Sequence, residues 1–562
     1  ACCQIARLPL LISFEREDLG VAKRYRPVDR DQRFLLAPDM REWLPENHLV
    51  WFLLDVVAEL DTTALHQRRR RRGQGLATGS AAGRAGYDPD MMLGLLIYAY
   101  ACGLQSSRRI ERLCHTDVAF RVLCAGDIPD HSVIARFRAG HQEVFTELFA
   151  QVLQLCARAG LGQVGTVAID GSKFAANASL TANHQRDWFA RAAAERTAAA
   201  AETDTAEDRA EQQRLERGEG SGREDGAAAD QVPERWSGGD RRARIRACLD
   251  ELEIICDAAD ADAASKHEQA QADLAARRGE LERLRAEQQD KIDRWHAAWA
   301  DHRARPTFYL APQGPCPKPL EQTWRGQRAE HALAQAQARA DRADRAADTN
   351  DHEQGHEQKG AARRNVTDPD SRLMTSRRGW VQGYNAQFAI TADQLVLATQ
   401  VTQNPNDNPC FIPMTQAAVA AARDIATTAR PDEPVDEHGG IGLLLADAGY
   451  ASEANLTAPG PDRLIALGKT RAQHRAAHDH PTHGEPPAGA TARQAMDHRL
   501  RTPDGHAAYK RRGATVEPGI GNIKKLLPHL ARRGLTAASA EITFAALVHN
   551  LRKLYSARAA AA

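Results

Sequence analysis

Residues 509–530 read YKRRGATVEPGIGNIKKLLPHL and place one carboxylate, Glu517, within a run of basic side chains. Proline is tolerated in a first helical turn but not in an interior, so a helix is expected to begin close to Pro518, with Thr515 as its N-cap. Glu517 and Lys524 then share one face. An acid beside cations suits a site for a metal ion and phosphate, although a plain amphipathic surface helix shows the same pattern. The apolar residues that recur at helical spacing are Val516, Ile520, Ile523, Leu527 and Leu530.

The overall charge is balanced, because 74 Lys and Arg residues face 74 Asp and Glu residues in a chain of 562. Any basic surface must therefore be local. Residues 509–558 hold ten Lys or Arg against two Glu, which is about +8 and favours a phosphate backbone. The ten cysteines include no C-x-x-C pair and indicate reduced thiols of a cytoplasmic protein. No run approaches the ~18 apolar residues that a membrane span requires.

Residues 1–30 show no clear period, and helical patterns recur at 39–60 and from residue 89 to 159. In the last but one of these helices, residues 130–141, Asp130 is the expected N-cap, and Arg136 and Arg138 are expected to face outward. Short helices in this order, ending in exposed arginines, are compatible with a helix-turn-helix DNA reader. A plain helical bundle with ordinary surface arginines fits the same pattern.

A short buried strand is expected at 164–169, ending on Asp170. Residues 181–364 are rich in Ala, Arg, Glu, Asp and Gln, and we interpret them as an inserted helical arm with disordered patches. Residues 471–507 are expected to be loop-like. Further strands are predicted at 381–391, 395–402, 441–446 and 464–467, and the third of these ends on Asp447.

Without the arm, two strand-end aspartates and one helix glutamate converge at the carboxyl edge of a mixed sheet. Asp170, Asp447 and Glu517 supply the hard oxygen ligands that Mg²⁺ prefers. Two such ions, about 3.5–4 Å apart, activate a water or a 3′-OH and stabilise the leaving oxygen of a phosphodiester.

Several segments in the same order resemble the bacterial insertion-sequence DDE transposases, which have a ribonuclease H-like core behind an N-terminal helical domain. The resemblance implies that Asp170, Asp447 and Glu517 are the catalytic acids. It also implies that the tyrosine, arginine and lysine around the glutamate, namely Tyr509, Arg512 and Lys524, contact DNA near the scissile end. The matching segments are AIDGSKFAANAS (168–179), NVTDPDSRLMTSRRGWVQGYNAQ (365–387), ADAGYASEANL (446–456), YKRRGATVEPGIGNIKKL (509–526) and AALVHNLRKLY (545–555).

Two departures from the family pattern lie in the same helix. Gly513 stands where relatives usually carry another basic residue, and Gly519 and Ile520 replace a bulkier apolar pair. A glycine there costs about 1 kcal/mol of helix stability and loosens the glutamate. A decayed, inactive copy is therefore an alternative to an active enzyme.

The sequence thus predicts an α/β ribonuclease H-like core, a mixed sheet flanked by helices, with an all-α N-terminal domain and a large helical insertion. The expected domains are residues 1–160 for DNA binding, residues 161–180 and 365–562 for catalysis, and the insertion 181–364. The expected function is Mg²⁺-dependent cutting at terminal inverted repeats and joining of 3′-OH ends to target DNA, with Mn²⁺ as a substitute ion. The expected partner is double-stranded DNA, bound by at least a homodimer in the bacterial nucleoid.

The alternatives are a structure-directed nuclease that hydrolyses without joining, and a catalytically inactive or domesticated DNA-binding protein. A scaffold built on the helical arm ranks below both. The side chains expected to hold DNA, mostly through phosphates, are Arg136, Arg138, Lys173, Tyr509, Lys510, Arg511, Arg512, Lys524 and Lys525.

Overall fold

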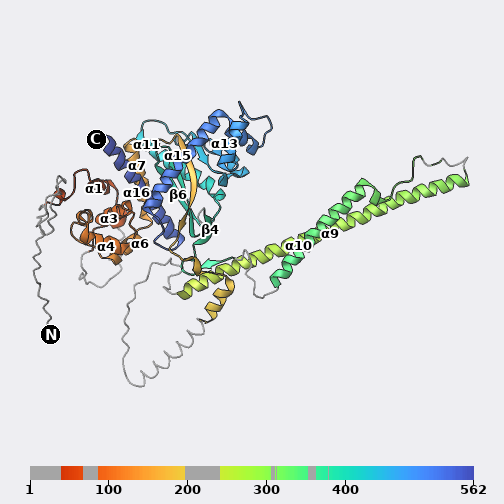
Figure 1. The fold of residues 1–562 in the computed structure, drawn as a ribbon, viewed down its shortest axis with the longest axis horizontal. Coiled ribbons are helices and arrows are strands. Elements are labelled where there is room, and N and C mark those ends of the chain that lie inside the picture. The colour runs from red at the N-terminus through yellow and green to blue at the C-terminus, as the bar shows by residue number, and fades with distance from the viewer. Residues whose placement is uncertain are drawn as a thin grey trace, which may run out of the picture.

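The computed structural model consists of a body, in which helices flank a mixed sheet, and a long helical arm that projects from it (Figure 1). None of the described helices is both long and apolar enough to cross a membrane. The structure describes residues 39–66, 86–195, 241–305, 311, 313–351, 362–376 and 379–561.

Short helices form the N-terminal part of the body, and the predicted N-cap Asp130 is confirmed. Asp88 accepts a hydrogen bond from the backbone of Asp90 and is followed by Pro89 at the first helical position, while Asp130 accepts one from Ser132. The elements are η1 (Met40–Trp43), α1 (Leu49–Glu59), α3 (Pro89–Ala101), α4 (Ser107–Thr116), α5 (Val118–Leu123), α6 (His131–Gly140) and α7 (Val144–Arg158).

The predicted mixed sheet is confirmed, with the strand order β6-β5-β1-β7-β8. β5 runs antiparallel to β1 and β6, and β7 runs parallel to β1 and β8; β4 pairs with the first residues of β5. β2 (Asn183–His184) and β3 (Arg364–Asn365) form a separate pair. The strands of the main sheet are β1 (Thr166–Ala175), β4 (Arg372–Ser376), β5 (Gly379–Thr391), β6 (Val396–Thr402), β7 (Leu443–Ala446) and β8 (Arg463–Ile465).

The prediction that the first strand ends on Asp170 is wrong, because β1 continues to Ala175. Its antiparallel pairing with β5 extends along the whole strand, whereas its parallel pairing with β7 stops at Ile169 and Ala446. The acid therefore marks the point where one neighbouring strand ends and the other continues.

A single hydrophobic core joins the N-terminal helices to the sheet, since Leu53, Phe145, Ile169, Leu445 and Phe544 belong to one buried cluster. α11 packs on β5 and β6, and so does the closing helix α16, which also packs on α7. The remaining elements of this part are η5 (Asn408–Cys410), α11 (Phe411–Ala429), η6 (Ala448–Tyr450), α12 (Glu453–Thr457) and α16 (Leu535–Ala561).

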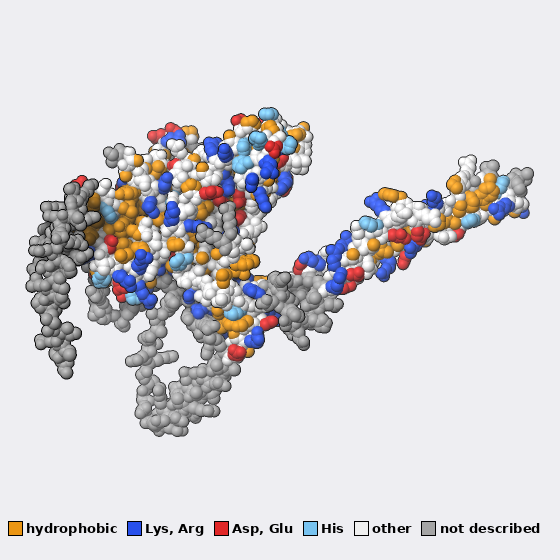
Figure 2. Space-filling view, in the orientation of Figure 1, with side chains coloured by type: hydrophobic (Ala, Val, Ile, Leu, Met, Phe, Trp, Pro, Cys, Tyr) orange, Lys and Arg blue, Asp and Glu red, His pale blue; other side chains and the backbone are white. Residues whose placement is uncertain are grey.

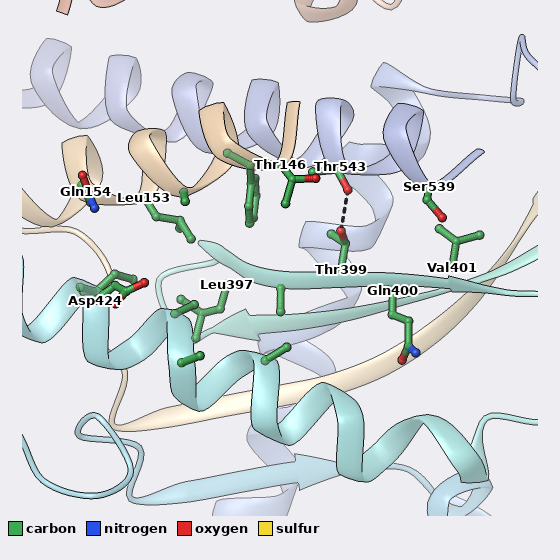
Figure 3. Close-up of a pocket in the computed structure, with 17 residues that line it drawn as sticks. Thr146, Leu153, Gln154, Leu397, Thr399, Gln400, Val401, Asp424, Ser539 and Thr543 are labelled. Carbon is green, nitrogen blue, oxygen red and sulfur yellow. Dashed lines mark hydrogen bonds between the residues drawn. The ribbon is translucent and has the colours of Figure 1, made fainter. Parts of the chain in front are cut away.

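A cavity of about 590 Å³ lies between β6, α7, α11 and α16 (Figure 3). Thr399 of β6 and Thr543 of α16 share a hydrogen bond of 3.1 Å at its wall. Its other lining residues are mostly apolar, and none of the predicted site residues is among them. The candidate chemistry therefore lies elsewhere.

The arm is an antiparallel pair of helices, α9 (Arg241–Ala304) and α10 (Trp324–Asp351). The short helix η4 (Leu320–Gln322) lies in the connection between them, just before α10. Small apolar clusters hold the pair together, one around Leu274 and one around Leu281. Figure 2 shows basic and acidic side chains interspersed along it, so the described arm is not a basic surface. The predicted helical insertion is thus present. The part of it at 196–240, where disordered patches were predicted, lies outside the described residues.

The base of the arm is anchored to the sheet by Glu251 of α9. Its carboxylate pairs with Arg364 at 2.9 Å and with Arg372 at 2.7 Å. Both arginines are largely buried, with side chains 9% and 17% exposed. One acid on the arm therefore fixes two strand residues of the body.

The prediction that residues 471–507 are loop-like is wrong. They contain α13 (Thr470–Asp479) and α14 (Ala492–Arg501) and lead into α15 (Pro503–Leu526). The polar composition of these helices hid them, because only Ala477, Met496 and Leu500 of α13 and α14 are buried.

The predicted start of the basic helix is also wrong. Thr502 caps α15 by accepting a hydrogen bond from Gly505, and Pro503 takes the first position. Thr515 lies in the interior, where its hydroxyl donates to the carbonyl of Arg511 at 3.0 Å. Pro518 is therefore an interior proline, tolerated because buried residues on both sides of it hold the helix against the sheet.

Candidate active site

Two aspartates lie side by side at the end of β7. The register that pairs Ile169 with Ala446 makes Asp170 and Asp447 the next residues of two neighbouring parallel strands. Asp170 accepts a hydrogen bond from the amide of Gly171 at 2.8 Å, and Asp447 accepts one from the amide of Gly449 at 2.9 Å while it caps η6. The backbone thus orients one oxygen of each carboxylate.

Helix α15 brings an arginine to this edge. Arg512 Nη1 donates to Asp170 Oδ2 at 3.0 Å, and the two side chains are only 12% and 19% exposed. The ring of Tyr509, one turn earlier, is buried beside Arg512, and its hydroxyl makes no hydrogen bond of normal geometry. An unsatisfied buried hydroxyl is costly, so this group is a candidate to bind something the chain itself does not supply.

The surroundings of Asp170 make its carboxylate easier to protonate than that of an exposed aspartate. Burial raises the pKa of Asp170 to about 6, the Arg512 guanidinium opposes this rise, and the neighbouring Asp447 adds to it. Two carboxylates in one place destabilise each other's charge, and a bound cation would remove that cost.

Glu517 also lies on α15, but among the described residues it makes no hydrogen bond or ion pair with Asp170 or Asp447. Its side chain is exposed, and a Cβ built at Gly513 would lie 3.5 Å from Glu517 Oε1. The structure therefore brings two of the three predicted acids together, and the part played by Glu517 stays a prediction.

The predicted DNA-binding cations divide into two groups. Lys173 is held within the body, where its ammonium donates to the carbonyl of Pro405 at 2.7 Å and pairs with Asp407 at 3.3 Å. Lys524 is exposed and lies over the ring of Phe174, 5.3 Å from its centroid. The other exposed members are Arg136, Lys510, Arg511 and Lys525.

The prediction that Arg138 faces outward is wrong. Its side chain is buried and donates to the carbonyl of Gln105 at 2.6 Å. It also lies beside the buried Tyr100 and Glu541 of α3 and α16. A guanidinium in this position joins the N-terminal helices to α16 instead of meeting DNA.

The sequence-based prediction missed one acid of this region, Asp407. It follows β6 in the turn NPNDNP (residues 404–409), a composition that reads as an ordinary loop. In the fold, its carboxylate lies against Gly171 and Gly449, the glycines that follow the two strand-end aspartates. Gly171 and Gly449 were the available signal in the sequence, because a glycine often marks a position where another part of the chain approaches the backbone closely.

The two unusual glycines of α15 have different surroundings. A Cβ at Gly519 would lie 2.8 Å from Ile390 Cδ1, so the helix approaches β5 closely there and a larger residue would not fit without movement. A Cβ at Gly513 would meet only Glu517, at an ordinary distance. Gly519 is thus a packing residue, while Gly513 leaves open space beside the glutamate.

The donor set of this edge fits a divalent cation. Asp170 and Asp447 offer hard carboxylate oxygens of the kind that Mg²⁺ and Mn²⁺ prefer. The Tyr509 hydroxyl, which has no hydrogen-bond partner among the described residues, adds a further polar group to this edge.

A mixed sheet with paired acids at a strand end and a basic helix beside them is an arrangement of enzymes that act on phosphodiesters. Comparison with protein families makes the class specific. Residues 38–140 match a family described as "Transposase domain (DUF772)", and residues 476–555 match one described as "Transposase DDE domain".

The first match covers α1 to α6, and the second covers α14, α15 and most of α16, including Tyr509, Arg512 and Glu517. Together they confirm the resemblance to insertion-sequence DDE transposases. A DNA substrate follows from that class. Neither the curated proteins nor the solved structures include a significant match to this chain.

Proposed function

We propose that the protein is the DNA transposase of an insertion sequence, which cuts at terminal inverted repeats and joins the freed 3′-OH ends to target DNA. The observation that carries this proposal is the register of β1 and β7. It sets Asp170 beside Asp447 at the edge on which α15 packs, in a chain that matches two transposase families.

The strand order supports a ribonuclease H-like core. Three antiparallel neighbours, β6, β5 and β1, continue into two parallel strands, β7 and β8. Asp170 follows the part of β1 that pairs with β7, and Asp447 follows the end of β7. We also retain the division into an N-terminal part to residue 160, a catalytic part at 161–180 and 365–562, and the insertion 181–364.

In this proposal Asp170, Asp447 and Glu517 hold two Mg²⁺ ions. Bound there, the ions lower the pKa of water and stabilise the leaving oxygen. Arg512 moves from Asp170 toward a phosphate, and the Tyr509 hydroxyl donates to the DNA or to an ordered water. The buried strands on both sides of the aspartates exclude bulk water from the reacting phosphate.

The exposed cations of α15 provide the adjoining DNA surface. Lys510, Arg511 and Lys525 lie on the solvent side of the helix whose buried side faces the sheet. They contact phosphates and do not read the base sequence. Recognition of the terminal repeats is assigned to the N-terminal helices, with Arg136 of α6 as the exposed contact, and the handling of two ends to at least a dimer in the bacterial nucleoid.

The test uses DNA that carries the flanking ends of the element itself. Wild-type protein is incubated with and without Mg²⁺, and 3′ ends and joined products are mapped. Metal-dependent cutting followed by joining supports the proposal. Cutting without joining supports the structure-directed nuclease, and DNA binding without any product contradicts catalysis.

One observation favours a second candidate, a catalytically inactive DNA-binding protein. Glu517 is exposed, it belongs to no cluster of three metal ligands found among the described residues, and Gly513 leaves its flank open. In that case the assay gives binding that persists in EDTA, and Gly513→Arg, which restores a basic residue next to Glu517, restores metal-dependent cutting. Gly519 should be left unchanged, because Ile390 fills the space beside it.

A further inference from the structure

Asp407 lies at the same edge of the sheet, in the turn between β6 and α11, and one of its oxygens is held by three donors. Oδ1 accepts from Lys173 Nζ at 3.3 Å, from Asn385 Nδ2 at 2.6 Å and from Gln387 Nε2 at 2.8 Å. Asn385 and Gln387 are strand residues of β5 and are fully buried. The carboxylate is therefore fixed in orientation by rigid neighbours.

The other oxygen, Oδ2, accepts no hydrogen bond from the described residues, and it faces Asp447. A Cβ at Gly449 would lie 3.4 Å from Asp407 Oδ2 and 3.0 Å from Asp447 Oδ1. Both carboxylate oxygens therefore lie close to Gly449, on the side where a side chain would project. On the opposite side, a Cβ at Gly171 would lie 2.6 Å from Asp407 Oδ1, so only glycine permits this approach.

A second, independent feature points to a ligand at this edge. The hydroxyl of Tyr509 is buried and unpaired, and it lies close enough to Asp447 and Asp170 to feel their charge. Buried polar groups are normally satisfied. Asp170 is already paired with Arg512, and Asp407 Oδ1 with Lys173. Among the described residues, however, Asp447 has no ion pair and the Tyr509 hydroxyl has no hydrogen-bond partner.

We propose that Asp407 is a further metal-binding carboxylate of this site, presenting Oδ2 beside Asp447 Oδ1 to a divalent cation. The inference rests on the proposed function and adds a fourth acid to the three predicted from the sequence. The three donors on Oδ1 act as the outer hydrogen bonds that orient a ligating carboxylate. Lys173 then serves to hold Asp407 and not to bind phosphate.

The competing explanation is that Asp407 only anchors Lys173 and the loop at residues 404–409. The two explanations differ in what they predict for metal affinity. If Asp407 binds the metal, removing its charge weakens metal affinity more than removing Lys173 does. If Asp407 only anchors Lys173 and the loop, removing either side chain has the same effect on metal affinity.

The experiment measures Mn²⁺ binding directly, by the electron paramagnetic resonance signal of free Mn²⁺, on full-length protein without DNA. Asp407→Asn keeps an acceptor for the three donors and removes the charge. We expect it to weaken Mn²⁺ binding about tenfold or more. Asp447→Asn should do the same, and Lys173→Met, which removes only one of the three donors to Oδ1, should weaken Mn²⁺ binding less than Asp407→Asn does.

Two further variants guard the interpretation. Gly449→Ala leaves every carboxylate in place and adds a methyl group close to both oxygens, so it should also weaken Mn²⁺ binding, even if Asp407→Asn does not fold. Asp424→Asn, an exposed acid of α11 outside the site, is the matched control and should bind Mn²⁺ as the wild type does.

Unchanged Mn²⁺ binding in Asp407→Asn or Gly449→Ala, with weaker binding in Asp447→Asn, overturns the role of Asp407 alone. An equal loss in Asp407→Asn and Lys173→Met assigns Asp407 to anchoring and also overturns it. If Asp447→Asn binds Mn²⁺ as tightly as the wild type, the metal site of the proposed function fails as well.

Discussion

The edge of the sheet and helix α15 supply the same proposed site in two different ways. At the edge, Asp170 and Asp447 are placed by backbone hydrogen bonds between fully buried strand residues. On α15, four glycines and an interior proline lower the intrinsic helix stability, and the helix is held by its buried side chains. The aspartates are therefore fixed by register, while the position of Glu517 depends on packing.

This difference teaches where the site is rigid and where it can adjust. A strand acid moves only if the sheet slips, and a one-residue slip would move every side chain of the strand to the opposite face of the sheet. A helix acid moves when its helix shifts by a fraction of a turn. We expect substitutions at the edge to remove the chemistry and substitutions on α15 to tune it.

The largest effect is expected at the edge. Asp447→Asn keeps the cap on η6 and removes one negative charge, so metal-dependent cutting should fall about 10³-fold, since a divalent ion supplies several kcal/mol. DNA binding, measured by gel shift in EDTA, should stay unchanged. Wild-type cutting rates in this variant would break the assignment of the edge as the site.

Glu517→Gln sharpens the comparison on the helix side. If packing brings Glu517 to the metal when DNA binds, cutting should fall about 10²-fold, a smaller loss than at the edge. Asp504→Asn in the first turn of the same helix is the matched control and should cut normally. Equal rates for the two variants would exclude Glu517 from the reaction.

The packing of α15 on the sheet is tested by its two unusual glycines. Gly519→Val places a side chain against Ile390 and should lower the free energy of unfolding by about 1–3 kcal/mol. Gly513→Ala meets only ordinary contacts and should raise it by up to about 1 kcal/mol. Urea unfolding measures both, and a neutral Gly519→Val would show that α15 does not pack on β5 as described.

The pH dependence isolates one acid of the edge. With the pKa of Asp170 raised to about 6 by burial, lowering the pH from 7 to 5 should reduce Mn²⁺ binding about tenfold, because the proton competes with the ion. In the metal-free protein the sign is opposite. A carboxyl whose pKa rises on folding stabilises the folded state as the pH falls from about 6 toward 3.8.

A second buried acid provides the control for this pH profile. Burial also raises the pKa of Asp368 to about 6, but its carboxylate accepts from the Tyr384 hydroxyl and from the amide of Gly534. Asp368→Asn should therefore leave the pH dependence of Mn²⁺ binding as it is. If that dependence disappears in Asp368→Asn, its assignment to Asp170 is wrong.

The sheet was largely predictable from the sequence, because buried strands appear as short apolar runs. The predicted ranges 381–391 and 441–446 cover β5 and β7 to within two residues. β4 was not predicted as a strand, and α13 and α14 were missed, because little of their surface is buried and periodicity then gives no signal.

The site was predictable in part, for a related reason. Asp170 and Asp447 follow apolar runs, so their placement depends on strand patterns that the sequence shows. Arg138 and Asp407 depend on contacts with residues far along the chain, the first with Gln105 and the second with Lys173. Helical spacing alone placed Arg138 outside, and turn composition alone made Asp407 an ordinary loop residue.

The register of β1 and β7 also has a consequence for synthesis of the protein. β1 leaves the ribosome long before β7, since the whole arm is translated between them. Asp170 and Asp447 cannot lie side by side until β7 has joined the sheet. Pairings between strands so far apart in the sequence form slowly in folding. A truncated chain that stops within the arm therefore lacks the acidic edge, and the proposed site can form only after the arm and β7 have been translated.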